Sequence, residues 1–288
     1  MIIRKFHPGS EWLYFKIYTG VKTADTLLQE ALEPLFEQLK NQDLIEKWFF
    51  IRYNDPKSHL RLRLNIRNPD DYSRILEMIN SIFHDYLESG EVSSVIIDTY
   101  SREIERYGEN TMEFAEDLFF KSSELILNFL DYNDEEKIIT SLFYIDHTLS
   151  AFHFSLEEKT EFAKRAESAF KSEFNADKNL NNQLKKKYNE FYPQYFDFIN
   201  SDEFVEIRDV IKSTVIEITA APEELVKLEK DNLLEIKLKD FLKSIFHMHI
   251  NRLFISHQRL FEMVVYDHLL RFYKTQKGYL LKKKFEVF

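Results

Sequence analysis

The chain has 288 residues, of which 44% are hydrophobic and only 5 are Gly and 6 are Pro. This composition predicts a globular protein with a sizeable core and excludes extensive disorder. A formal net charge of -10 argues against a protein whose main task is to grip nucleic acid, because such affinity rests largely on phosphate neutralisation. The lack of cysteine excludes disulfides, thiolate metal sites and thiol nucleophiles.

The N-terminal sequence MIIRKFHPGSEW lacks the apolar run of a signal peptide. No apolar stretch approaches the roughly 20 residues needed to span a bilayer. We therefore expect a soluble, cytoplasmic protein of bacterial type. The 15% aromatic content indicates deep aromatic packing or a peptide-binding surface.

The first hundred residues carry the strand signals of the chain. Alternating and turn-bounded runs predict strands, and apolar positions at helical spacing predict helices, with Pro34 kinking or dividing the first one. In chain order these are a strand at 11–19, a helix at 25–40, a hairpin of strands at 47–53 and 59–66 joined by NDPKS, a helix at 70–87 and a strand at 92–100. This order predicts an α+β arrangement, with helices covering a mixed or antiparallel sheet.

From residue 109 onward nearly every segment has helical periodicity. The exception is the Asn- and Lys-rich run at 175–187, which we interpret as a mobile insertion or linker. We therefore predict one domain over 1–288, with a sheet-rich part at 1–108 and a helical part at 109–288.

Cations interrupt the otherwise apolar hairpin. Alternation places His59, Arg61 and Arg63 on the strand face opposite a row of leucines, while Arg52 shares a face with Trp48 and Phe50. Whether the two sets point to the same side depends on the strand register, which the sequence leaves open. If they do, the guanidinium groups form an anion pocket suited to carboxylates. The alternative is a solvated sheet face with ordinary surface ion pairs.

Two further segments contain candidate groups. The sequence YSREIERYG, residues 100–108, follows a strand, and its Glu105 and Arg106 fit either the rim of a site or a charged connector. In SIFHMHINRLF, residues 244–254, His247 and Asn251 share one helix face and His249 lies nearly opposite. This spacing excludes joint metal chelation by the two histidines. One imidazole could transfer protons; the alternative is a hydrogen-bonded histidine in an aromatic core.

Other site types find no support in the sequence. It contains neither a Gly-rich phosphate loop nor the GxSxG motif of serine hydrolases. We expect neither a metal nor a cofactor.

Four stretches in chain order carry a family resemblance: EWLYFKIYTG, WFFIRYNDPKSHLRLRL, TYSREIERYG with MEFAEDLFFKSSE, and SIFHMHINRL. Together they resemble the C-terminal domain of lantibiotic dehydratases and the related stand-alone thiopeptide-type bacteriocin biosynthesis proteins. The resemblance implies a lyase that expels glutamate from glutamylated Ser or Thr of a ribosomally made precursor peptide, leaving dehydroalanine or dehydrobutyrine. It further implies the small subunit of a split dehydratase, whose large glutamylation subunit would handle the tRNA.

The resemblance also implies roles for individual residues. The family uses arginines and a late histidine in elimination, which by motif correspond to Arg52, Arg61, Arg63 and His247. The substrate-binding residues that we expect around them are Lys16, His59, Glu105, Arg106, His249 and Arg252.

Two alternatives stay open for the function. Related proteins include pyridine synthases of thiopeptide pathways, which join two dehydroamino acids in a formal cycloaddition. The other alternative is a non-catalytic subunit that docks the peptide through its aromatic surface. The expected partners are the glutamylated precursor peptide and the large subunit, without direct tRNA binding, and a homodimer is a family-level expectation.

Overall fold

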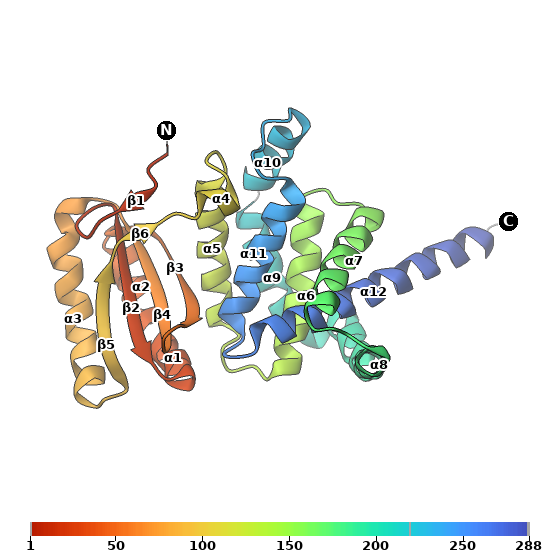
Figure 1. Ribbon diagram of the computed structural model, residues 1–288, viewed down its shortest axis with the longest axis horizontal. Helices are drawn as coiled ribbons and strands as arrows, with labels where there is room; N and C mark the ends of the chain where they lie inside the picture. The colour runs from red at the N-terminus through yellow and green to blue at the C-terminus, as the bar shows by residue number, and fades with distance from the viewer. Residues whose placement is uncertain (1, 219, 287–288) are drawn as a thin grey trace. The chain divides into compact units, whose positions relative to one another are not determined.

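The computed structural model describes residues 2–218 and 220–286 (Figure 1). Its chain forms two compact units, each assembled from two segments: Met1–Asp131 with Asp231–Ser256, and Tyr132–Lys230 with His257–Phe288. The structure is 67% helical, with two small antiparallel sheets near the N-terminus. The predicted α+β class is confirmed, and the one-domain organisation stays a prediction.

The first unit contains all the strands that the structure describes, and each predicted element appears in it. Its elements are β1 Lys5–Phe6, β2 Trp12–Thr19, α1 Val21–Leu27, a π-helical segment Leu28–Leu32, α2 Glu33–Asn41, β3 Ile45–Asn54, β4 Ser58–Ile66, α3 Tyr72–Glu88, β5 Val92–Asp98, β6 Tyr100–Ser101, α4 Ile104–Tyr107, α5 Met112–Leu127 and α11 Leu238–Leu253. Pro34 lies at the start of α2, directly after the π-helical segment, so the predicted helix changes its hydrogen-bond pattern there while its backbone stays helical. Proline has no N–H to donate within the helix, and a π-helical turn is one way in which a helix accommodates such a local irregularity.

Four strands form the main antiparallel sheet in the order β3-β4-β2-β5, and β1 pairs separately with β6 (Figure 1). One face of the sheet carries buried apolar side chains that pack under α1, α2 and α3. The Phe36 ring of α2 stacks on Trp48 of β3 with ring centroids 3.8 Å apart. This apolar face, buried against amphipathic helices, is the core of the first unit.

The outer edge of β3 is covered by α5 and α11, whose side chains form hydrogen bonds with the backbone of β3 that a fifth strand would otherwise form. Asn251 accepts from the Arg52 N–H and donates to the Arg52 carbonyl, both at 3.0 Å. Arg252 Nε donates to the Phe50 carbonyl at 2.7 Å, and the Phe50 N–H donates to Ser123 Oγ at 3.4 Å. These bonds satisfy edge groups that would otherwise be unpaired. They hold α11 against the hairpin.

The second unit is helical. Its helices are α6 Asp134–Ala151, α7 Leu156–Glu173, α8 Lys178–Asn200, α9 Val205–Glu217, α10 Ala220–Lys230 and α12 Gln258–Glu286. Capping boxes at Asn133 and Ser155 start α6 and α7. The run that the sequence marks as an insertion, 175–187, mostly belongs to α8, and Asp177 caps this helix by accepting from the Leu180 N–H. None of the helices in the described ranges is both long and apolar enough to cross a membrane.

Candidate active site

The strand register decides which hairpin cations share a face. In the pairing of β4 with β3, Arg52 lies opposite Leu60, and Arg61 lies opposite Ile51. Side chains of directly opposed residues point to the same side of a sheet. Arg52 therefore lies on the apolar face, whereas Arg61 and Arg63 lie on the other. The condition for a joint pocket of three guanidinium groups is not met, and that interpretation is wrong.

Arg52 has partners that explain its place on the apolar face. Its side chain is 7% exposed, forms an ion pair with Asp25 of α1, and donates from Nε to the Arg252 carbonyl at 2.7 Å. Burial lowers the pKa of Arg52, and the charge of Asp25 opposes that shift. A buried arginine paired in this way ties α1 and α11 to β3. Its contacts are those of a structural anchor.

The opposite side of the sheet carries the remaining hairpin cations. Strand β2 supplies Lys16 to this face and β4 supplies His59, Arg61 and Arg63; we call these four residues the cationic face. The register places Lys16 directly opposite Arg61. Lys16 forms an ion pair with Asp98 of β5, and the hydrogen bond that Lys16 donates to Asp98 raises the pKa of Lys16. Asp98 thus offsets one of the positive charges.

Arg63 is a buried cation among aromatic rings. Its side chain is 7% exposed, and its guanidinium carbon lies 4.6 Å from the ring centroid of Tyr14, 4.9 Å from that of Tyr100 and 5.3 Å from that of Phe49. Its Nε and Nη1 have no hydrogen-bond partner among the described residues. Burial lowers the pKa of Arg63, and the neighbouring charge of Arg61 acts in the same direction. Cation–π contacts compensate such burial only in part, so these two buried N–H groups keep donor capacity that no described residue uses.

Arg61 is half-buried beside Arg63 on the same strand. Its guanidinium lies flat against Tyr53, 3.4 Å from the ring centroid. Its Nε donates to His59 Nε2 at 3.2 Å, and this is its one hydrogen bond within the described part of the chain. The Nη groups are left for a ligand or solvent. Arg61 and Arg63 are two residues apart, and neither has a carboxylate partner among the residues placed by the structure.

The histidines of α11 lie in two environments, as the spacing predicts. His247 is half-buried. His249 is 1% exposed and its Nδ1 lies 3.0 Å from Ser122 Oγ of α5. Burial lowers the pKa of His249 to about 3, so this imidazole is neutral at pH 7 and a poor base. Arg252 is fully buried, and its guanidinium lies over Phe119, 4.8 Å from the ring centroid.

The two candidates in α4, shortly after β6, make surface contacts. Glu105 pairs with Arg4 at 2.6 Å, and both side chains are exposed. Arg106 pairs with Glu103 at 3.5 Å. Such ion pairs contribute little stability. These contacts agree with the connector interpretation of YSREIERYG, and a role of either residue at the rim of the site stays a prediction.

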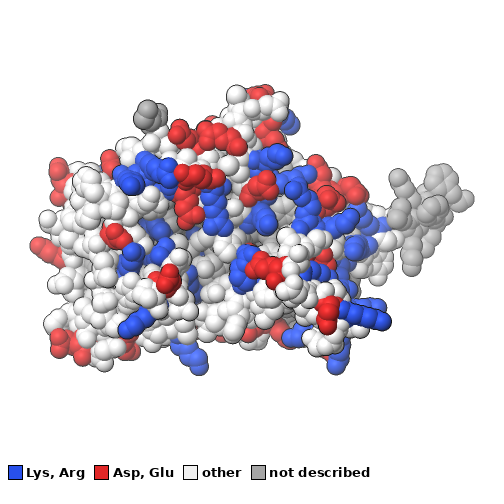
Figure 2. All heavy atoms as spheres, in the orientation of Figure 1, with Lys and Arg blue, Asp and Glu red and all other residues white. Residues whose placement is uncertain are grey.

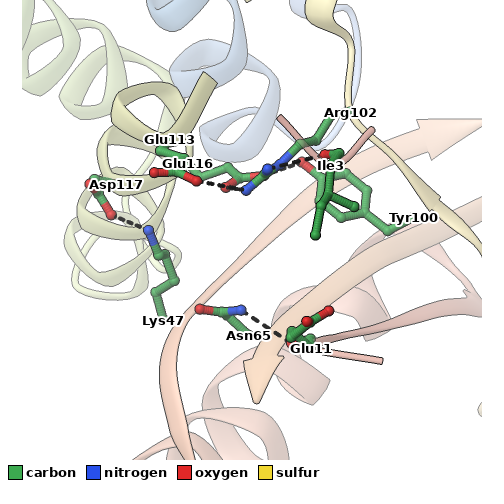
Figure 3. A network of polar contacts seen from close by, with 9 residues as sticks. All are labelled: Ile3, Glu11, Lys47, Asn65, Tyr100, Arg102, Glu113, Glu116 and Asp117. Carbon is green, nitrogen blue, oxygen red and sulfur yellow. Dashed lines mark hydrogen bonds and ion pairs between the residues drawn. The ribbon is translucent and has the colours of Figure 1, made fainter. Parts of the chain in front are cut away.

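Sequence reasoning missed Arg102, which organises the loop after β6 (Figure 3). It is 6% exposed and donates from Nε and Nη2 to the two oxygens of Glu116 at 2.8 and 2.7 Å. Glu116 also accepts from the Tyr100 hydroxyl at 2.8 Å. The network therefore fixes the tyrosine that covers Arg63. The signal was available, because Tyr100 and Arg102 are two residues apart in an extended segment and lie on the same side.

A cavity of about 380 Å³ lies next to this network in the first unit. Lys47 and Asn65 line it from the sheet, and Arg102, Glu113 and Glu116 line it from the loop and α5 (Figure 3). Lys47 pairs with Asp117 at 2.5 Å. Across the described residues, no group of three or more His, Asp or Glu side chains is arranged to hold a metal ion. Figure 2 shows acidic and basic side chains interspersed over the face it presents.

Comparison with known proteins assigns the chain to a family. The family model described as "Lantibiotic biosynthesis dehydratase C-term" matches residues 12–273. The subtilin biosynthesis protein SpaB of Bacillus subtilis is 27% identical over 268 residues, which cover 88% of this chain and 24% of SpaB. The nisin biosynthesis protein NisB of Lactococcus lactis is 28% identical over 278 residues, covering 94% of this chain and 26% of NisB. The chain thus spans about a quarter of the length of these curated relatives.

Solved structures share the fold. The tRNA-dependent lantibiotic dehydratase MibB from Microbispora superposes with a TM-score of 0.68 at 17% identity, covering 94% of this chain and 28% of MibB. The pyridine synthase TbtD from thiomuracin biosynthesis gives a TM-score of 0.61 at 14% identity, covering 92% of this chain and all of TbtD. Because the family match extends over most of the sequence, the chain belongs to the family of C-terminal domains of lantibiotic biosynthesis dehydratases.

Proposed function

We propose that this chain is a lyase that eliminates glutamate from glutamylated Ser or Thr residues of a ribosomally made precursor peptide, in lanthipeptide-type biosynthesis. The observation that carries the proposal is the pair Arg61 and Arg63, adjacent on one sheet face and without a carboxylate partner among the described residues. Guanidinium groups bind carboxylates through parallel charge-assisted hydrogen bonds. A glutamyl group esterified to the peptide carries one free carboxylate into the site. When glutamate is eliminated, its ester group leaves as a second carboxylate.

The reaction requires three functions from the protein. A base removes the Cα proton, donors stabilise the enolate that forms on the peptide carbonyl, and a cation receives the departing carboxylate. The proton passes to the base and the C–H electron pair enters the enolate. This pair then forms the Cα=Cβ bond as the Cβ–O bond breaks, and the electrons of the Cβ–O bond leave with glutamate. In this proposal Arg61 and Arg63 bind the carboxylates, and Lys16 adds positive charge that Asp98 partly offsets.

His247 is the proposed base. Of the two α11 histidines it is the half-buried one, whereas His249 is enclosed and its pKa is lowered to about 3. A general base works best when its pKa lies near the working pH, which disfavours His249 as the base. In this scheme Arg52 and Arg252 act from behind the site, by holding α11 against the edge of β3. Glu105 and Arg106 would line its rim.

The proposed partners follow from the chemistry. A lyase of this kind needs a glutamylated peptide as substrate, and therefore a glutamylation subunit to make it. Both SpaB and NisB, which match this chain over a quarter of their length, are biosynthesis proteins of lantibiotics, subtilin and nisin respectively. We place the chain in the same class of pathway, in the cytoplasm. Self-association as a homodimer remains part of this proposal.

The test is to incubate the chain with a glutamylated precursor peptide and to follow the peptide by mass spectrometry. The expected product has lost one glutamic acid per modified residue. Arg61→Ala and Arg63→Ala should each lower the rate about 100- to 1000-fold, the usual effect of removing one preorganised donor. An unchanged peptide that still binds would contradict the proposal and favour a docking subunit. A product in which two dehydroamino acids have been joined would favour a pyridine synthase.

A further inference from the structure

The imidazole of His59 is held between one acceptor and one donor. Its Nδ1 lies 2.8 Å from the Lys57 carbonyl oxygen, and its Nε2 lies 3.2 Å from Arg61 Nε. A carbonyl oxygen only accepts a hydrogen bond, and arginine Nε only donates one. The proton must therefore sit on Nδ1, and Nε2 must be bare. These contacts select one neutral tautomer of His59.

Aromatic rings enclose this imidazole. Tyr18 of β2 stacks on it with ring centroids 4.6 Å apart and an interplanar angle of 30°. Tyr53 of β3 lies 5.4 Å away, and His59 is only 2% exposed. An imidazole so enclosed has both nitrogens occupied and cannot contact a peptide substrate. This placement differs from the direct substrate contact that the sequence indicates for His59.

The same contact determines the position of Arg61. The hydrogen bond to His59 fixes Nε on one side of the guanidinium, and the Tyr53 ring fixes its plane at 3.4 Å. The two Nη groups, which have no partner among the residues that the structure describes, are then the only donors that Arg61 can offer. We propose that His59 is a positioning residue, which uses the bare Nε2 of its neutral imidazole to aim the Arg61 guanidinium at a carboxylate. This inference rests on the proposed function of the cationic face and adds a pH dependence to it.

The surroundings of His59 favour the neutral form. Charged or titratable groups face it from β4 (Arg61), from β2 (Lys16 and Tyr18), from β3 (Tyr53) and from the hairpin turn (Asp55). Burial lowers the pKa of His59, and the charges of Arg61 and Lys16 lower it further. The hydrogen bond with the Lys57 carbonyl and the charge of Asp55 act in the opposite direction, but the net pKa is lowered. Protonation of His59 Nε2 would turn its N–H toward the Nε–H of Arg61, so that two donors and two positive charges would face each other. Acidification should therefore release Arg61 and weaken elimination.

Two substitutions separate positioning from packing. His59→Gln places a non-titrating amide oxygen within reach of Arg61 Nε, whereas His59→Phe keeps a ring beside Tyr18 but removes the acceptor. We expect His59→Phe to lower kcat/KM for the glutamylated peptide about 10- to 100-fold, as for a misplaced catalytic group. His59→Gln should restore most of the rate and make it fall less at acidic pH than the wild-type rate does. In an Arg61→Ala background, His59→Phe should have no further effect.

Wild-type activity in His59→Phe, or an equal loss in the Arg61→Ala background, would overturn the inference. A spectroscopic measurement tests it without turnover. In protein labelled with ¹⁵N at its 9 histidines, the resonances lost in His59→Gln identify His59, and long-range ¹H–¹⁵N correlation gives its tautomer. We expect neutral imidazole with the proton on Nδ1 at pH 7. An imidazolium or an Nε2-protonated ring would refute the positioning role whatever the activity, whereas the expected tautomer in an inactive protein would refute only the proposed function.

Discussion

Replacing Glu116 by glutamine should destabilise the first unit severely. Glu116 is fully buried and accepts three hydrogen bonds, from Arg102 Nε, Arg102 Nη2 and the Tyr100 hydroxyl, at 2.7 to 2.8 Å. In Glu116→Gln the amide NH₂ faces a guanidinium donor, and Arg102, 6% exposed, loses the carboxylate that balances its charge. Removing one partner of a buried pair costs about 3–5 kcal/mol. We expect the free energy of unfolding to fall by that amount.

The chain offers both a matched control and a local probe for this measurement. Glu113 lies 3.8 Å from the same guanidinium but is 72% exposed, so Glu113→Gln should change the free energy of unfolding by about 0–1 kcal/mol. Both tryptophans, Trp12 and Trp48, belong to the first unit. Their fluorescence during urea denaturation therefore follows that unit alone. A loss below about 1 kcal/mol in Glu116→Gln, or equal losses in the two variants, would refute the reasoning.

Two further variants test the packing of α11. Because burial lowers the pKa of His249 from 6.5 to about 3, the unfolded chain binds a proton that the folded chain does not, and stability should fall by about 1.4 kcal/mol per pH unit as the pH drops from 6.5 toward 3. His249→Gln should lack this contribution. If the free energy of unfolding, measured by denaturation at several pH values in this range, falls equally with pH in the variant and the wild type, the prediction is contradicted. Asn251→Ala should lose about 1–3 kcal/mol, since it leaves the N–H and C=O of Arg52 unpaired. The Arg52 amide should also lose protection from hydrogen exchange in Asn251→Ala. Unaltered protection would argue against the contact between Asn251 and the edge of β3.

Much of the first unit could be predicted from the sequence, because alternation and helical spacing are local properties. The register of the hairpin could not. The structure pairs Asn54 with Ser58, and this pairing aligns even-numbered residues of β3 with even-numbered residues of β4. A turn shorter or longer by one residue would have reversed the face of one strand. The sequence NDPKS predicts a turn but does not specify which residues pair across it.

The candidate site shows the same division between local and distant information. Alternation alone groups Arg61 with Arg63 and His59. Whether a cation has partners within the protein depends on residues far along the chain. Arg52, for example, donates a hydrogen bond to the carbonyl of Arg252. Alternation could place Arg102 on the side of Tyr100, but its contact with Glu116 could not be predicted, because Glu116 lies in a different element.

The central claim is that the guanidinium groups of Arg61 and Arg63, which have no carboxylate partner in the described part of the chain, recognise a peptide-bound glutamate. The most direct test compares the binding of a glutamylated precursor peptide with that of the unmodified peptide, by calorimetry, in the wild type and in Arg61→Gln/Arg63→Gln. A hydrogen bond to a charged group is worth about 1.5–3 kcal/mol, so the wild type should bind the glutamylated peptide at least about tenfold more tightly. The double variant should bind the two peptides equally. Equal binding by the wild type, or a preference that survives in the double variant, would contradict the account.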